Sequence, residues 1–259
     1  MHKEILKQAF KNLPIPSFRF FSETDSTNTQ ALDWISEGVQ EYSLVVADSQ
    51  TAGRGRSGRS WVTTPGSSLA VSIILHPTKN EINKLGLFSL LGGFCVCKVL
   101  EDSFSIDGQV KWPNDVLIKN KKTAGILAES TWQGKNLQGI VLGIGINLLM
   151  PSIPPSEELL FPATCVQSHT PDTIDAVTIL AKLIGTLMTV RSSMLFPSFI
   201  EQYENKLAYK NQLVTLDDGS ETLIFGRLKG IDTFGNIRLQ ISEKEERCFP
   251  IGDIKLRLK

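Results

Sequence analysis

Short apolar runs separated by turn residues recur through the first 150 positions of the chain. Most of these runs are rich in β-branched or aromatic side chains and are too short for helices, so they predict strands. Two of them flank a Pro-Asn-Asp turn, and the last two follow one another closely enough to form a pair. The predicted strands span residues 18–21, 44–47, 69–75, 110–112, 116–119, 122–131 and 139–146.

Helical spacing of apolar residues marks four further segments. In the first, residues 28–36, Ser26 or Thr27 stands where a side chain could cap the helix. The most apolar segment, residues 85–100, contains Lys98 and three glycines and is too short to span a bilayer comfortably, so it predicts a buried helix. The remaining predicted helices span residues 172–194 and 199–207.

Residues 150–162 contain four prolines and predict a loop. The pattern of the chain changes again in its last fifty residues. From residue 211 onward, short strands are separated by Asp-Asp-Gly and Phe-Gly-Asn turns, which is typical of a small antiparallel barrel. We therefore expect two domains, residues 1–208 and 209–259. The predicted strands of the second domain span residues 212–216, 221–229, 236–241 and 246–250.

Charge and cysteine content narrow the class of protein. The 27 Lys and Arg residues balance the 27 Asp and Glu residues, which argues against a chain built to coat nucleic acid or a basic membrane surface. The four cysteines form no C-x-x-C pair and have no spaced histidine pair of the zinc-site kind. With no apolar secretory leader at the start, this composition predicts reduced thiols and a cytoplasmic protein.

Residues 50–61, QTAGRGRSGRSW, contain a glycine-rich motif with three arginines. Gly53, Gly55 and Gly58 match the spacing of a dinucleotide-binding fingerprint. That fingerprint requires a helix opening at the third glycine and an acidic residue about twenty positions later, and the sequence offers neither. Arg54, Arg56 and Arg59 instead predict an anion site, with glycines letting the backbone approach the ligand. The alternative is a solvated, flexible arginine loop.

A second motif, Lys111-Trp112-Pro113-Asn114-Asp115, lies between two predicted strands. A lysine at a strand end beside a common Pro-Asn-Asp turn can be purely structural. Next to an anion-binding loop, however, the lysine, the amide and the carboxylate are groups that fix a phosphorylated ligand or its cation. Asp115 is the candidate ligand for Mg²⁺, which usually takes one or two carboxylates together with phosphate oxygens.

Five segments in order resemble the biotin protein ligases. They are Asp25-Ser26-Thr27-Asn28, residues 50–61, residues 111–115, Lys122–Glu129 and Gly143-Ile144-Gly145-Ile146-Asn147. The resemblance covers nearly the whole chain and is closest in the glycine-arginine segment. It implies an α+β fold, a mixed sheet flanked by helices in the manner of class II aminoacyl-tRNA synthetases, followed by an SH3-like barrel.

The resemblance also implies a two-step reaction. The carboxylate of biotin attacks the α-phosphate of ATP and gives biotinyl-5′-AMP with release of pyrophosphate. A lysine of a biotin carboxyl carrier protein then attacks the mixed anhydride, forming an amide and releasing AMP. Both reactants of the first step are anions, so catalysis requires positive charge that neutralises them.

The implied site residues fall into three groups. Lys111 and Arg56 are the expected catalytic residues, and Asp115 is the expected Mg²⁺ ligand. Biotin is expected to contact Ser26, Thr27, Asn28, Gln50, Arg54, Gly55, Arg56, Lys111 and Gly125. ATP and the adenylate are expected to contact Arg56, Arg59, Trp61, Lys111, Asn114 and Asn147.

Several alternatives remain at this stage. A lipoate or octanoate ligase would share the attacked carboxylate and the lysine, but such enzymes lack the glycine-arginine loop. A biotin-sensing protein would keep the pocket without the chemistry. Only about twenty-five residues precede the Ser-Thr-Asn motif, so we expect no DNA-binding module and no nucleic-acid partner. We expect no membrane association either, and either a monomer or a homodimer.

Overall fold

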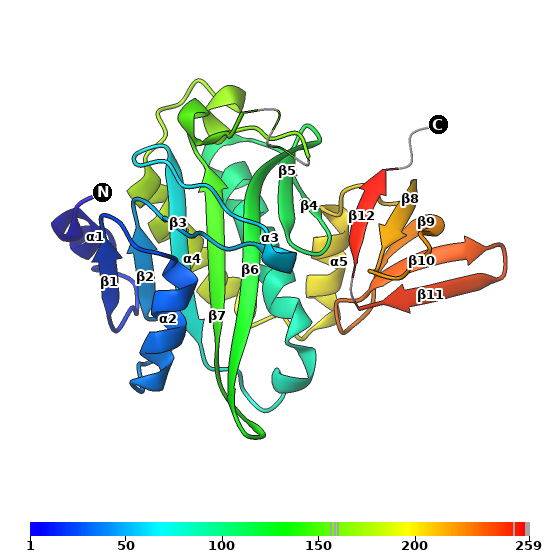
Figure 1. Ribbon diagram of the computed structural model, residues 1–259, viewed down its shortest axis with the longest axis horizontal. Helices are drawn as coiled ribbons and strands as arrows, with labels where there is room; N and C mark the ends of the chain where they lie inside the picture. The colour runs from blue at the N-terminus through cyan, green and yellow to red at the C-terminus, as the bar shows by residue number, and fades with distance from the viewer. Residues whose placement is uncertain (156, 158, 160, 251, 257–259) are drawn as a thin grey trace.

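Two β-sheets form the scaffold of the protein (Figure 1). The computed structural model describes residues 1–155, 157, 159, 161–250 and 252–256. The first sheet has seven strands in the order β1-β2-β3-β7-β6-β5-β4, with β1 and β2 parallel and the other neighbours antiparallel. These strands are β1 (Phe18–Phe21), β2 (Leu44–Ala47), β3 (Ser68–Leu75), β4 (Gly108–Lys111), β5 (Asp115–Ile118), β6 (Lys121–Gln133) and β7 (Asn136–Asn147).

Helices cover both faces of this sheet unequally. The helices α1, α3, α4 and α5 contribute apolar side chains to the main core. Helix α2 packs against β2, β3 and β7 on the other face, over a smaller apolar cluster. Side chains alternate between the two faces along each strand, as the pleat requires. In β3, for example, Ile73 joins the main core and Ile74 the cluster beneath α2. The helices are α1 (Lys3–Ala9), α2 (Thr27–Ser36), α3 (Gly86–Phe104), α4 (Ala176–Arg191) and α5 (Pro197–Asn205).

The second sheet is antiparallel and lies at the far end of the molecule from α1 (Figure 1). Its order is β11-β10-β9-β8-β12. The buried indole of Trp112 ties the second sheet to the turn between β4 and β5 of the first, because its Nε1 donates to the carbonyl of Gly235 at 2.9 Å. The strands are β8 (Leu213–Asp217), β9 (Ile224–Ile231), β10 (Ile237–Ser242), β11 (Glu245–Phe249) and β12 (Asp253–Leu256).

The predicted fold class is confirmed: a mixed sheet flanked by helices, followed by a small antiparallel sheet. All predicted helices and strands are present, and the strands predicted at 122–131 and 139–146 pair as β6 and β7. Helix α1 and strand β12 were not predicted. Both are short, and the N-terminal segment containing α1 is polar at intervals. The predicted loop 150–162 begins with a short 3-10 turn, Met150–Ser152, and its positions 156, 158 and 160 lie outside the described residues.

The predicted side-chain cap of α2 is wrong. Ser26 occupies the N-cap position, but its side chain makes no capping hydrogen bond. Gln50 performs that task from the neighbouring loop, since its Oε1 accepts from the backbone N–H of Thr27 at 2.8 Å. Among the described residues, no helix has the length and apolar character needed to cross a membrane.

Candidate active site

A cavity of about 730 Å³ opens on the face of the sheet that carries α2. Its walls come from the start of α2, the segment 50–61, the turn between β4 and β5, and β12. Every residue predicted for the site lines this cavity, although these residues come from five separate parts of the chain: Ser26, Thr27, Asn28, Gln50, Arg54, Gly55, Arg56, Arg59, Trp61, Lys111, Asn114, Asp115, Gly125 and Asn147.

Glycines form the floor of the cavity. Gly125 of β6 lies directly opposite Gly145 of β7, and the indole of Trp61 lies against both. A Cβ atom at Gly145 would stand 2.3 Å from Trp61 Cε2, and one at Gly125 would stand 3.0 Å from Cζ3. Gly143 similarly leaves room for the carboxamide of Asn28. Only glycine at these positions lets side chains from the opposite wall lie directly on the sheet.

Uncharged polar side chains gather at the N-terminus of α2. The Thr27 hydroxyl donates to Gln50 Oε1 at 3.1 Å, and Ser72 Oγ lies 2.8 Å from the Thr27 hydroxyl. Gln50 Nε2 in turn donates to the hydroxyl of Thr63. Because each polar atom is already oriented by a neighbour, this part of the cavity is preorganised for a neutral ligand with hydrogen-bonding groups.

The glycine-arginine segment is a folded loop rather than a solvated coil. Gly55 N–H donates to the Arg59 carbonyl at 2.7 Å, and Trp61 N–H donates to the Gly53 carbonyl at 2.8 Å. Gly58 has a φ of +72°, a conformation that favours glycine. No helix opens at Gly58, and the chain continues to β3, so the exclusion of a dinucleotide fingerprint is confirmed.

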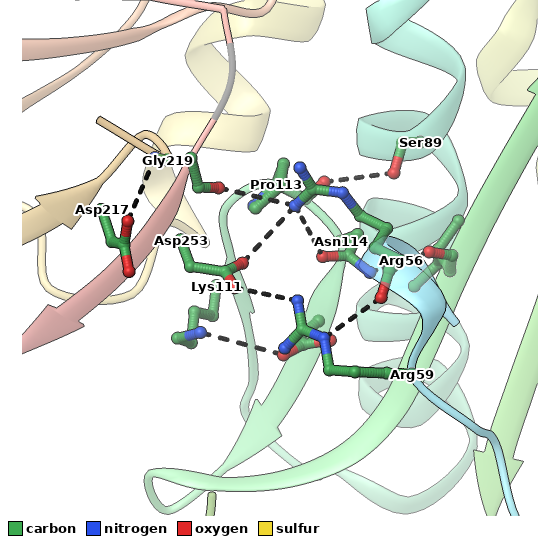
Figure 2. A network of polar contacts seen from close by, with 12 residues as sticks. Arg56, Arg59, Ser89, Lys111, Pro113, Asn114, Asp217, Gly219 and Asp253 are labelled. Carbon is green, nitrogen blue, oxygen red and sulfur yellow. Dashed lines mark hydrogen bonds and ion pairs between the residues drawn. The ribbon is translucent and has the colours of Figure 1, made fainter. Parts of the chain in front are cut away.

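Arg56 and Arg59 converge on one carboxylate from the C-terminal sheet (Figure 2). Asp253 Oδ2 accepts from Arg59 Nη2 at 2.8 Å, and Asp253 Oδ1 lies 3.5 Å from Arg56 Nη1. Arg56 Nη1 also donates to Asn114 Oδ1 at 3.4 Å. Burial lowers the pKa of Arg56, partly offset by Asp253. Two neighbouring guanidinium groups thus share a carboxylate of the protein itself, and their binding of a ligand anion stays a prediction.

Arg54 makes a different contact. Its Nη2 forms an ion pair with Oε1 of Glu129 on β6. Both side chains line a shallow groove together with the rest of residues 52–60 and Leu127. The assignment of Arg54 to the carboxylate of a ligand therefore stays a prediction. It would require this side chain to leave or share the carboxylate of Glu129.

Lys111 stands at the end of β4 and is only 8% exposed. Burial lowers the pKa of Lys111, and the charge of Asp115 partly offsets this effect. The Lys111 ammonium lies 3.8 Å from Asp115 Oδ2, and Lys122 Nζ lies 2.6 Å from Asp115 Oδ1. The turn thus holds a buried cation at the cavity wall, in reach of an anionic ligand.

The residues around Asp115 do not fit a magnesium ion held by the protein alone. Both carboxylate oxygens already face lysine ammonium groups. The described part of the chain contains no cluster of three His, Cys, Asp or Glu residues of metal-binding geometry. The Mg²⁺ assignment to Asp115 stays a prediction, and no step proposed below depends on it.

Two of the residues predicted to contact ATP and the adenylate, Asn147 and Trp61, have contacts of their own. Asn147 Nδ2 donates to the carbonyl of Thr164 at 3.2 Å, which ties the end of β7 to the segment after the proline-rich loop. The Trp61 indole lies against Gly125 and Gly145, with Lys122 Nζ 5.6 Å from the ring centroid. A contact of either residue with the adenylate stays a prediction.

The polar residues in or beside the cavity that the site prediction did not name include Asp253, Glu129, Lys122 and Ser72. Lys122 and Glu129 are the first and last residues of a motif that the sequence analysis had singled out, and the two-residue period of β6 could have placed Glu129 on the same face as Gly125. Asp253 carried no signal, because β12 itself was not predicted and its position depends on the docking of the second sheet.

Comparison with known proteins adds an independent line of evidence. Residues 20–147 match the model of the Biotin/lipoate A/B protein ligase family. The chain is 35% identical over 237 residues to the bifunctional ligase/repressor BirA of Bacillus spizizenii, covering 89% of this chain and 71% of that protein. It is also 35% identical over 161 residues to the biotin–[acetyl-CoA-carboxylase] ligase of Paracoccus denitrificans, covering 60% and 64% of the two chains.

Solved structures agree with the sequence comparisons. The biotin protein ligase from Aquifex aeolicus in complex with biotin and ATP superposes with a TM-score of 0.80 and 30% sequence identity. The match covers 95% of this chain and 100% of that one, so it includes both sheets.

Proposed function

The chain belongs to the biotin/lipoate A/B protein ligase family, and we propose that it activates biotin with ATP and transfers it to a protein lysine. The observation that carries this proposal is the composition of the single cavity described above. Uncharged polar groups at α2 suit the ureido ring of biotin, and Arg56, Arg59 and Lys111 suit its carboxylate and the phosphates of ATP.

In the first step, a carboxylate oxygen of biotin forms a bond to the α-phosphorus of ATP, and the bond to pyrophosphate breaks. Both partners are negatively charged, so the chief task of the protein is to neutralise and orient them. Lys111 supplies a cation whose water has already been largely removed by burial. Arg56 is held at the same turn by Asn114, and Arg59 stands beside it on Asp253.

Recognition of biotin is assigned to Ser26, Thr27, Asn28 and Gln50, together with the glycine floor. Their hydroxyl and amide groups match the N–H and C=O groups of a ureido ring. A ring with no hydrogen-bonding groups of this kind would leave unused the donor and acceptor positions that these side chains do not spend on one another, so it should bind less tightly.

In the second step, the ε-amine of an acceptor lysine attacks the carbonyl of the mixed anhydride, an amide forms and AMP leaves. The acceptor that we propose is the biotin carboxyl carrier domain of a biotin-dependent carboxylase. We further propose that the enzyme acts in the cytoplasm, as a monomer or homodimer. The thiols of Cys95, Cys97, Cys165 and Cys248 are all free, which agrees with a reducing compartment.

The experiment that tests the proposal is acceptor labelling. The purified protein is incubated with ATP, magnesium, biotin and a biotin carboxyl carrier domain, and the acceptor mass is measured. In the wild-type reaction we expect the acceptor mass to rise once, by the mass of biotin minus that of water. The acceptor mass should not change when the acceptor lysine is replaced by arginine. An acceptor that is labelled with lipoate or octanoate and not with biotin would move the chain to the neighbouring activity of this family.

A further inference from the structure

Glu129 stands between two parts of the cavity that are distant in sequence. One carboxylate oxygen, Oε1, pairs with Arg54 Nη2 of the loop, and the other, Oε2, accepts from Asn28 Nδ2 at 2.7 Å. Resting on the proposed function, we propose that Glu129 is a positioning residue that couples the order of the loop to the orientation of Asn28, and thereby to biotin affinity.

The contacts of Asn28 show what Glu129 does at the α2 end. The amide nitrogen of Asn28 donates to Glu129 and, at 3.3 Å, to the Leu127 carbonyl. Carboxylate and carbonyl oxygens only accept, so the amide nitrogen must face them and the amide oxygen must face Ser72. A flipped carboxamide would place its oxygen against the carboxylate of Glu129. The charge of Glu129 therefore fixes the orientation of the Asn28 carboxamide, with its oxygen toward Ser72.

The space around Asn28 supports the same reading. A Cβ atom built at Gly143 would stand only 2.1 Å from Asn28 Oδ1, so the carboxamide lies directly against the backbone of Gly143. The side chain has no room to escape toward the sheet and is 4% exposed. Its orientation thus depends on its hydrogen-bond partners, of which Glu129 is the charged one.

At the loop end, Arg54 is the first of the three arginines, and Glu129 is its ion-pair partner on the sheet. The other two arginines are held by Asp253 of β12. The loop is therefore fastened at two points, one on the C-terminal sheet and one on β6. Since the second fastening is the same carboxylate that holds Asn28, loosening it disturbs the loop and the polar network together.

The test is Glu129→Gln in the full-length, ligand-free protein. The substitution keeps the shape of the side chain but leaves one oxygen for two donors, so Arg54 and Asn28 can no longer both be satisfied. The matched control is Glu37→Gln, which removes the carboxylate of another Arg–Glu pair, Arg19–Glu37, at the opposite end of α2.

Hydrogen–deuterium exchange of backbone amides is measured in residues 26–31 and 50–61, and the Kd for biotin is measured by calorimetry without ATP. For Glu129→Gln we expect exchange about fivefold faster in both segments, a Kd at least tenfold higher and an unchanged melting temperature. Glu37→Gln should leave all of these values as in the wild type. Arg54→Gln should reproduce the faster loop exchange, and the double variant should be no worse than Glu129→Gln alone.

Three results would overturn the coupling. The first is wild-type exchange in Glu129→Gln, and the second is faster exchange in only one of the two segments. The third is a double variant in which the two effects add, since independent contacts would do so. A wild-type protein that binds no biotin would refute the proposed function instead, and the exchange data would still decide whether Glu129 links the two segments.

Discussion

Asp253 Oδ2 accepts a hydrogen bond from Arg59 Nη2 at 2.8 Å, although 194 residues separate the two in the chain. The contact joins the C-terminal sheet to the glycine-arginine loop, and Asp253 also faces Arg56. The second sheet is thus part of the cavity wall. Its packing against the rest of the chain determines how Arg56 and Arg59, the two candidates for phosphate binding, are held.

We expect Asp253→Asn to raise the KM for ATP about fivefold while the KM for biotin changes less than twofold. The carboxylate offsets the repulsion between Arg56 and Arg59, and an exposed pair of this kind contributes about 1 kcal/mol. Initial rates of pyrophosphate exchange at varied ATP and varied biotin measure both constants.

The control is Asp217→Asn, which removes a carboxylate from β8, the strand that pairs with β12. Asp217 faces the turn at Gly219 rather than the arginines, so its replacement should leave both constants unchanged. If Asp253→Asn lowers the KM for ATP, the carboxylate competes with the nucleotide for the arginines instead of positioning them.

The rate of the first step should fall at alkaline pH because Lys111 loses its proton there. Burial lowers the pKa of Lys111 below its ordinary value of 10.5. The charged form is the one that neutralises the reacting anions, so kcat/KM for pyrophosphate exchange should fall as pH rises through this lowered pKa. A pH profile of the exchange rate measures the midpoint.

The variant Lys111→Arg keeps a cation that stays charged over this range, so its remaining activity should lack the alkaline decline. Lys111→Met should lose at least a thousandfold in exchange rate and yet fold. Across the interval between the folded-state and unfolded-state pKa values, wild-type stability should rise with pH, because the unfolded chain holds the lysine proton to higher pH. Exchange by Lys111→Met within tenfold of wild type would remove this residue from the reaction.

The glycine floor should not tolerate a methyl group. In Gly145→Ala, the new Cβ atom would overlap the Trp61 indole, so that ring must leave its position over the sheet. We expect the Kd for biotin to rise at least tenfold, measured by calorimetry. Gly185→Ala on α4 meets only an ordinary contact with Leu13, and it should preserve binding and raise stability by about 0.5 to 1 kcal/mol.

Glu81 should contribute to stability in a pH-dependent way. Burial alone would raise the pKa of Glu81, but hydrogen bonds from Arg191 and from the Thr78 N–H outweigh it and lower the pKa below the ordinary 4.5. Since the folded-state pKa is the lower one, the stabilisation is present above pH 4.5 and is lost as pH falls through the folded-state value.

We therefore expect Glu81→Gln to lower the free energy of unfolding at pH 7 by about 3 kcal/mol, because it leaves the buried Arg191 charge partly unpaired. The difference from wild type should shrink below pH 4.5. Urea unfolding at several pH values measures both effects. A constant difference across this range would contradict the assigned ion pair.

The sequence was informative wherever local pattern determines structure. Apolar runs located the strands of the first sheet, and the arginine and lysine motifs named the residues that the fold brings into one cavity. The predicted side-chain cap at Ser26 or Thr27 was wrong because a residue outside the helix, Gln50, provides the hydrogen bond. That contact depends on how two loops lie together, which no local pattern encodes.

Long-range partners were out of reach for the same reason. Asp253 and Glu129 look like ordinary carboxylates in the sequence, and only the docking of β12 and the register of β6 place them against arginines. The alternation along β7 does explain its glycines: Gly143 and Gly145 share the cavity face, while Ile144 and Ile146 fill the main core.

The central claim is that this cavity joins biotin to AMP. The most direct measurement is exchange of labelled pyrophosphate into ATP by the purified protein with magnesium, in parallel with biotin, lipoate and octanoate. We predict exchange that depends on biotin and is at background with the other two acids. Exchange with lipoate or octanoate in place of biotin, or no exchange with any of the three, would contradict the account.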